Sequence, residues 1–162
     1  LATDVYSRSK LECEMLFDKN NGVIARISNL YGVGMSTENV FSKIIQQVRC
    51  AGEVKVWNDK PIRDFLWVDD AVDALVEMAL GRAKGIYNVA SGRAVSIGEL
   101  IDAALLSSGV DKQYTRTLTK SADAYSAIFL DISDTFDSFG WAPKMKLEDG
   151  IKRLLNNEMR IQ

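Results

Sequence analysis

The sequence contains no histidine, and it has only two cysteines and two prolines among 162 residues. The absence of histidine excludes Ser–His and Cys–His catalytic pairs, zinc sites with imidazole ligands and any imidazole base. The two cysteines, Cys13 and Cys50, lack the CxxC spacing and the Cys/His clustering of zinc sites and disulfide frameworks. We therefore predict that acid–base chemistry uses other side chains, that no metal is bound, and that the protein occupies a reducing cytoplasm.

Long hydrophobic runs and an excess of positive charge are also absent. No apolar run reaches the ~18 to 20 residues that a membrane span requires, and no signal peptide opens the chain. Twenty basic against twenty-two acidic residues give a net charge of −2, so no broad positive field attracts nucleic acid. We expect a soluble protein with neither a nucleic-acid nor a membrane partner.

The residues that are present describe an ordinary globular chain, with 47% hydrophobic and 26% charged residues in a length typical of one domain. Segments with helical spacing alternate with short apolar runs. The predicted helices are 3–19, 40–50, 69–80, 96–109, 133–139 and 147–159, the predicted strands 23–27, 54–57, 85–89 and, more weakly, 113–118, and the predicted loops 28–38 and 111–127. This alternation favours an α/β fold with a largely parallel sheet, because consecutive parallel strands need a crossover between them.

Polar residues mark the starts of two of these helices. Ser96 precedes a helical run with Glu99 three places on, which predicts a capping box. Asp69 and Asp70 also stand at a helix start. A metal site is one reading of two adjacent carboxylates, but helix capping and the helix dipole explain them better.

Bulky side chains suggest where the chain packs. We expect Trp57, Trp67 and Trp141 to be core or packing residues, because tryptophan usually buries its ring. Cys13 is expected to pack its helix against the protein.

The first predicted helix carries the pair with the clearest chemical potential. Tyr6 and Lys10 are four residues apart, which places both side chains on one helix face. A free phenol is a poor base near neutral pH, and a nearby ammonium favours its ionised form. The pair could therefore move protons without histidine, although an isolated Y-x-x-x-K match is as well explained by a weak surface contact.

Four motifs follow one another in a fixed order along the chain. They are residues 6–10 (YSRSK), 26–32 (RISNLYG), 62–70 (IRDFLWVDD) and 85–92 (GIYNVASG), and 139–143 (FGWAP) closes the series. In this order they resemble the extended short-chain dehydrogenase/reductase family, in particular its NAD-dependent nucleotide-sugar epimerases and dehydratases. The resemblance spans nearly the whole chain, and four ordered motifs are far more specific than any one of them.

The resemblance implies a role for the Tyr6 and Lys10 pair. Tyr6 would be the acid/base that exchanges a proton with a sugar hydroxyl while hydride passes to or from NAD or NADP. Lys10 would bind the nicotinamide ribose and hold Tyr6 partly ionised. Both residues would therefore contact the cofactor as well as serve catalysis, and Ser28 would approach the cofactor through its backbone.

The same resemblance assigns a nucleotide-sugar substrate to two further residues. Asn29 would lie near the substrate diphosphate, and Arg63 would bind that diphosphate through its guanidinium fork. Without the resemblance, Asn29 could simply cap a turn, and Arg63 could pair with Asp64 or Asp69 on the surface.

Several parts of the family pattern are missing from this chain. The dinucleotide fingerprint G-x-x-G-x-x-G, the first strands of the sheet and the upstream catalytic Ser or Thr have no counterpart, and Val33 replaces the usual Pro after Tyr-Gly. We therefore expect residues 1–162 to be a single fragment: the C-terminal part of a Rossmann-like parallel sheet together with the small substrate-binding subdomain. Such a fragment should be inactive alone and should require an N-terminal half. The resemblance also implies that the Tyr6 helix could form a homodimer interface.

Two other functions remain open. One is an NAD(P)-dependent reductase of a carbonyl substrate other than a nucleotide sugar, which would not need Arg63 for a diphosphate. The other is a non-catalytic binding module that docks to a partner supplying the missing strands, since half a parallel sheet leaves unpaired backbone groups.

Overall fold

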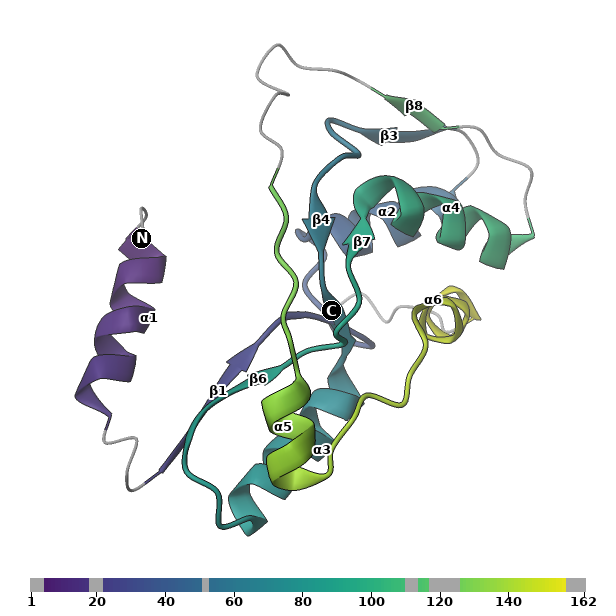
Figure 1. Cartoon of the computed structure of the whole chain (residues 1–162). Coiled ribbons are helices and arrows are strands. Elements are labelled where there is room, and N and C mark those ends of the chain that lie inside the picture. The colour runs from purple at the N-terminus through teal and green to yellow at the C-terminus, as the bar shows by residue number, and fades with distance from the viewer. Residues whose placement is uncertain (1–4, 18–21, 51–52, 110–113, 117–125, 157–162) are drawn as a thin grey trace.

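The computed structural model describes residues 5–17, 22–50, 53–109, 114–116 and 126–156, and its chain alternates helices with short strands (Figure 1). The helices are α1 (Val5–Leu16), α2 (Val40–Arg49), α3 (Val68–Leu80), α4 (Ile97–Ser108), α5 (Ser133–Phe139) and α6 (Leu147–Asn156). The strands are β1 (Val23–Ile27), β2 (Asn29–Tyr31), β3 (Val54–Val56), β4 (Ile62–Arg63), β5 (Phe65–Trp67), β6 (Gly85–Val89), β7 (Val95–Ser96) and β8 (Tyr114–Arg116). The predicted α/β class is confirmed.

The strands associate in pairs, and three of the four pairs in the described residues are parallel. β1 pairs with β6 from Val23 opposite Gly85 to Ile27 opposite Val89. β2 runs parallel to β5, and β3 runs parallel to β8, whereas β4 and β7 are antiparallel. One residue, Ser28, separates β1 from β2, so the chain changes its strand partner at that point.

Two hydrophobic clusters form the core. The larger lies among α2, α4, α6 and the short strands beside them, and it includes the fully buried Ile45 and Leu100. Tyr31 belongs to it, with its ring stacked on Phe41 at 4.5 Å between centroids. The smaller cluster lies where α3 packs on β1 and β5, with Met78 and Trp141 among its buried residues. β5 joins the two clusters, because Phe65 and Trp67 belong to the larger and Leu66 to the smaller; Figure 1 shows α2 and α4 at one end of the molecule and α3 at the other.

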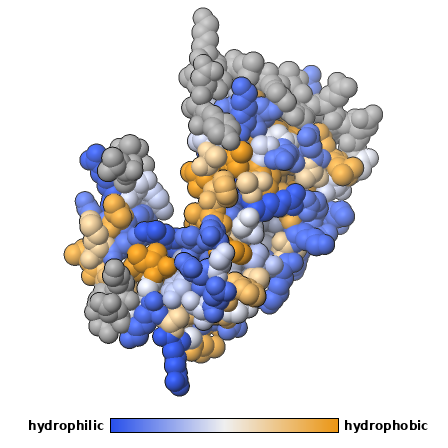
Figure 2. Space-filling model, viewed as in Figure 1, coloured by the Kyte–Doolittle hydropathy of each residue, from blue (hydrophilic) through white to orange (hydrophobic). Residues whose placement is uncertain are grey.

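Helix α1 contrasts with the other helices because none of its side chains is buried. Leu16, for example, is 87% exposed. Figure 1 shows α1 standing apart from the remaining elements, and Figure 2 shows an open hollow between its atoms and the rest of the molecule on this face. Helix α1 is therefore held by its connection to β1 and by few side-chain contacts.

Helix ends are partly as predicted. Ser96 accepts from the Glu99 N–H at 3.1 Å and the Glu99 carboxylate accepts from the Ser96 N–H at 2.7 Å, which confirms the capping box of α4. Asp69 and Asp70 lie in the first turn of α3, where they complement the helix dipole, but the predicted capping role is wrong. The N-cap is Trp67, and the buried Asp70 carboxylate accepts the Lys144 and Met145 backbone N–H groups.

Three packing or loop predictions are also wrong. Residues 29–31 of the predicted 28–38 loop form β2, because β5 supplies their hydrogen-bond partners. Trp57 is 77% exposed just beyond β3, whereas Trp67 and Trp141 are buried as predicted. Cys13 is exposed on α1 and packs nothing. Most of the predicted 111–127 excursion, the ends of the 113–118 strand and residues 157–159 lie outside the described residues.

Candidate functional site

Tyr6 and Lys10 share one face of α1, as their spacing predicts. The Lys10 Nζ lies 5.4 Å from the centroid of the Tyr6 ring, within the range of a cation–π contact. Tyr6 is 70% exposed, so its phenol is open to solvent and to any molecule that docks there. The geometry supports a paired phenol and ammonium.

An ion pair that the sequence did not reveal connects α1 to the sheet. The Arg26 guanidinium on β1 donates to both carboxylate oxygens of Glu14, at 2.9 and 2.5 Å. Hydrogen bonding from Arg26 holds the pKa of Glu14 below its usual value. This two-pronged geometry fixes direction as well as distance, so the pair orients α1 relative to β1.

Ser28 and Asn29 come together at a buried carboxylate that was not singled out from the sequence. Asp64 is fully buried, and the Ser28 hydroxyl donates to its Oδ1 at 3.2 Å. Asn29 donates to the Asp64 backbone carbonyl from its own backbone N–H at 3.1 Å and from its side-chain Nδ2 at 3.2 Å. The signal available in the sequence was a carboxylate directly before the apolar run 65–68.

Arg63 makes neither of the surface pairs proposed as its alternative role. Its Nη1 donates to the carbonyls of Ile62 and Ser126, at 2.8 and 3.0 Å. Asp64 is occupied by other donors, and Asp69 accepts the Trp67 indole N–H at 2.9 Å. Asn29 likewise caps no turn, because it lies in β2 and bonds to the neighbouring strand.

The Arg63 side chain borders a pocket of about 410 Å³ between α2 and the chain segment that follows β3. α2, β3 and the segment after β3 each contribute both apolar and polar side chains to its lining. The apolar residues are Val40, Ile44, Val56, Trp57, Pro61 and Ile97, and the polar ones are Glu38, Lys43, Gln47, Lys55, Asn58 and Arg63. Three cations therefore surround an apolar pocket whose volume falls within the range of small-molecule sites.

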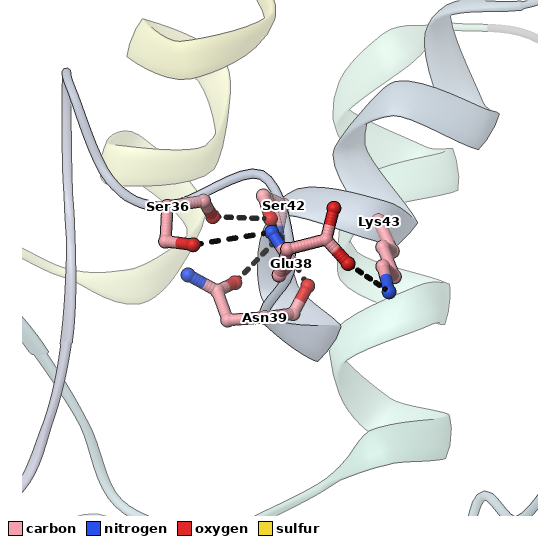
Figure 3. A network of polar contacts seen from close by, with 5 residues as sticks. All are labelled: Ser36, Glu38, Asn39, Ser42 and Lys43. Atoms are coloured by element: carbon pink, nitrogen blue, oxygen red, sulfur yellow. Dashed lines mark hydrogen bonds and ion pairs between the residues drawn. The ribbon is translucent and has the colours of Figure 1, made fainter.

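A hydrogen-bond network fixes the end of α2 that forms this rim (Figure 3). Asn39 caps the helix by accepting the Ser42 N–H at 2.8 Å, and the buried Ser42 hydroxyl donates to the Ser36 carbonyl at 2.7 Å. One turn along, the Lys43 ammonium pairs with Glu38 at 3.0 Å. The network therefore holds both charged side chains at the mouth of the pocket.

The predicted site residues thus fall into three places. Tyr6 and Lys10 lie on α1, Ser28 and Asn29 lie at the junction of β1 and β2, and Arg63 lies at the pocket. Within the described residues, no hydrogen bond or ion pair joins Tyr6 to the other two places.

None of the helices in the described part of the chain is long and apolar enough to cross a membrane.

Comparison with known proteins relates this arrangement to a family. Residues 2–90 match the profile of the NAD dependent epimerase/dehydratase family. The chain is 31% identical to the dTDP-L-rhamnose 4-epimerase of Burkholderia thailandensis over 94% of its own length and 45% of that protein. It is 28% identical to the dTDP-6-deoxy-L-talose 4-dehydrogenase (NAD(P)(+)) of Kitasatospora kifunensis, over 83% of the chain and 45% of that protein. The chain thus spans about half the length of these curated relatives.

Solved structures agree on the fold. RMD from Pseudomonas aeruginosa complexed with NADPH superposes with a TM-score of 0.85 at 22% identity, over 96% of this chain and 56% of the other. The UDP-N-acetylglucosamine 4-epimerase from Methanobrevibacter ruminantium gives a TM-score of 0.82 at 21% identity, over 96% of this chain and 53% of the other. These likenesses confirm the predicted Rossmann-like fold class.

Proposed function

Because the chain belongs to the NAD dependent epimerase/dehydratase family, we propose that it supplies the tyrosine-bearing and substrate-binding portion of a nucleotide-sugar epimerase or dehydratase. The observation that carries this proposal is the pocket with Arg63 at its border. An apolar wall suits a base and ribose, and a guanidinium suits a diphosphate. Lys43 and Lys55 lie on the same rim, where Lys43 is paired with Glu38 and Lys55 with Glu53.

The proposed chemistry assigns a proton to Tyr6. As the phenolate it takes a proton from a sugar hydroxyl while that carbon is oxidised, and the resulting phenol returns the proton on reduction, with the Lys10 ammonium held beside the ring. Asn29 contacts the substrate near its diphosphate, and the Ser28 backbone lies against the cofactor. When bound, NAD or NADP supplies the acceptor and donor of hydride.

The donor set of this chain fits only one end of that dinucleotide. A phenol and an ammonium on one helix face suit the nicotinamide ribose. No G-x-x-G-x-x-G sequence is present to cradle the pyrophosphate. We therefore propose that residues 1–162 act as one fragment that works with a second, N-terminal half.

Strand β1 offers a place for that half. Among the described residues β1 pairs only with β6, which leaves its other edge without a strand partner. An unpaired parallel strand carries N–H and C=O groups that another strand can satisfy. The exposed helix α1 beside it is the proposed homodimer surface, and the exposed Cys13 and Cys50 suit a reducing cytoplasm.

The first test is titration of the protein with UDP and dTDP. In Arg63→Ala we expect affinity for the preferred nucleotide to fall about tenfold to a hundredfold, because a charged hydrogen bond contributes about 1.5 to 3 kcal/mol. Arg82→Ala is the matched control, because Arg82 is exposed and lies away from this pocket. Unchanged affinity in Arg63→Ala would favour the reductase of another carbonyl substrate.

The second test joins the chain to the upstream half of a relative and measures turnover of nucleotide sugars. Tyr6→Phe should lower kcat by about 10² to 10⁴ with little change in substrate affinity, since only the proton transfer is lost. Tyr87→Phe is the control, because the Tyr87 hydroxyl donates to the Lys84 carbonyl away from α1. Absence of turnover in the joined wild-type protein would favour the non-catalytic binding module.

A further inference from the structure

We infer that Asp64 is the positioning residue of the site, a buried clamp that holds Ser28 and Asn29 where the chain passes from β1 to β2. The inference rests on the proposed function in one respect, because Ser28 and Asn29 are the residues proposed to meet cofactor and substrate. Asp64 itself is 0% exposed, so it would contact neither the cofactor nor the substrate. Its role is to fix the residues that do.

The Asp64 carboxylate receives four hydrogen bonds from two different segments. From the turn after β6, the Ser91 N–H and hydroxyl donate to Oδ1 at 2.8 and 2.7 Å, and the Gly92 N–H donates to Oδ2 at 3.0 Å. From the end of β1, the Ser28 hydroxyl donates to Oδ1 at 3.2 Å. Gly92 has φ 69°, a left-handed conformation that favours glycine and turns the backbone at this point.

The Asp64 main chain completes the clamp on the other side. Its carbonyl accepts both the backbone N–H and the side-chain Nδ2 of Asn29. One carboxamide proton is thereby committed, and among the described residues none donates to the carboxamide oxygen of Asn29. The exposed carboxamide is therefore held in one orientation, with its oxygen and its second N–H available to a ligand.

Asp64 is explained less well as a residue that only fills the core than as one that positions Ser28 and Asn29, because burying a carboxylate is unfavourable. Removing a carboxylate from water is unfavourable, and hydrogen bonds must offset that loss of hydration. An apolar side chain would fill the same volume without that cost. The carboxylate does what an apolar residue cannot: it fixes the end of β1 and the turn after β6 by directed bonds, beside the strand change at Ser28.

Amide hydrogen exchange, followed residue by residue in the full chain, tests the clamp. Asp64→Asn keeps the size of the side chain but places an amide donor against donors from Ser91 and Gly92. We expect exchange at Asn29, Ser91 and Gly92 to quicken about tenfold more than exchange in α4. The matched control is Thr135→Val, which removes another buried hydroxyl, bonded to the Asn88 carbonyl at 2.6 Å.

The control separates positioning from general destabilisation. If Thr135→Val quickens exchange at Asn29 as much as Asp64→Asn does, relative to α4 in each protein, the clamp is refuted. If Asp64→Asn does not fold, Ser91→Ala and Ser91→Thr decide the matter. Quicker exchange at Asn29 in the Ala variant, restored by the hydroxyl of the Thr variant, supports the clamp, and wild-type exchange at Asn29 in Ser91→Ala overturns it.

The exchange measurement requires no ligand, so its outcome is independent of whether the protein binds UDP. Failure of the wild-type protein to bind UDP and dTDP would remove the proposed function while leaving the clamp to be judged by exchange. Where UDP binds, its affinity should fall in Ser91→Ala but not in Ser91→Thr or Thr135→Val. Equal UDP affinity in the wild type and these three variants would show that the clamp does not position a ligand contact.

Discussion

The part of the molecule built on α2, α4 and α6 and the part built on α1 and β1 are held together by different forces. The first surrounds a hydrophobic cluster with fully buried side chains such as Ile45, Leu100 and Ile151. In the second, α1 has no buried residue, and the ion pair of Glu14 with Arg26 orients it. The pocket region is therefore stabilised by its own packing, whereas the Tyr6 helix has little packing of its own.

This contrast bears on where the proposed reaction would be assembled. The pocket near Arg63 is lined by residues of α2, β3 and the start of α4, together with the segment that follows β3. Tyr6 and Lys10 project from the helix with the least support. The pocket can thus be largely preformed, whereas Tyr6 and Lys10 require further packing to be held in place.

The largest expected difference between the two parts comes from equivalent leucine truncations. Leu100→Ala should lower the free energy of unfolding by about 2 to 5 kcal/mol, because Leu100 is fully buried and its loss leaves a cavity. Leu16→Ala removes the same atoms from an 87% exposed position of α1, and it should change stability by less than about 0.5 kcal/mol. Urea unfolding measures both. Similar losses would mean that α1 is buried in solution.

An intermediate effect is expected at the start of α4. Ser96→Ala removes the hydroxyl that accepts the Glu99 N–H and donates to its carboxylate, which should cost about 1 kcal/mol. Thermal unfolding measures the loss. Ser108→Ala in the last turn of the same helix is the control, because it removes a hydroxyl outside the capping box.

The same cap predicts a pH dependence with a defined sign. Hydrogen bonds from the Ser96 backbone and hydroxyl hold the pKa of Glu99 below its usual value. A carboxyl whose pKa is lowered on folding contributes stability above its unfolded value of about 4.3, and that contribution disappears as the pH falls through the lowered pKa. The stability difference between wild type and Glu99→Gln should therefore shrink on acidification. A difference that grows toward acid pH would contradict the cap.

A small global effect is also expected for Glu14→Gln. The ion pair with Arg26 is exposed, so unfolding free energy should change by no more than about 1 kcal/mol. Amide protection in α1 should nevertheless fall, because the contact that orients the helix is weakened. Exchanging the charges, Glu14→Arg with Arg26→Glu, should restore protection. Unaltered protection in the single variant would show that other contacts hold α1.

The sequence predicted those features that depend on local spacing. The six helices and the strands β1, β3 and β6 follow from apolar periodicity, and the capping box of α4 follows from Ser96 and Glu99. Strands β2, β4, β5 and β7 were not predicted; each has two or three residues and pairs with another segment of the chain. Their existence depends on partners far along the chain, which no local pattern reveals.

The candidate site divides in the same way. The shared face of Tyr6 and Lys10 was predictable from four-residue spacing. The role of Asp64 was not, because its partners Ser28 and Ser91 lie far from it in sequence. The exposed Trp57 was mispredicted because its residue type favours burial, while the fold places it just past the end of β3, at the pocket.

The parallel pairing of β1 with β6 also has a kinetic consequence. Val23 pairs with Gly85, and all the residues of β2, α2 and α3 lie between them. Closing so long a loop loses chain entropy before any strand bond forms, and parallel pairs of high contact order fold slowly. The bonds of Ser28 and Asn29 to Asp64 span shorter separations, of 36 and 35 residues. The β1–β6 ladder should therefore form later in folding than the contacts between the start of β2 and Asp64.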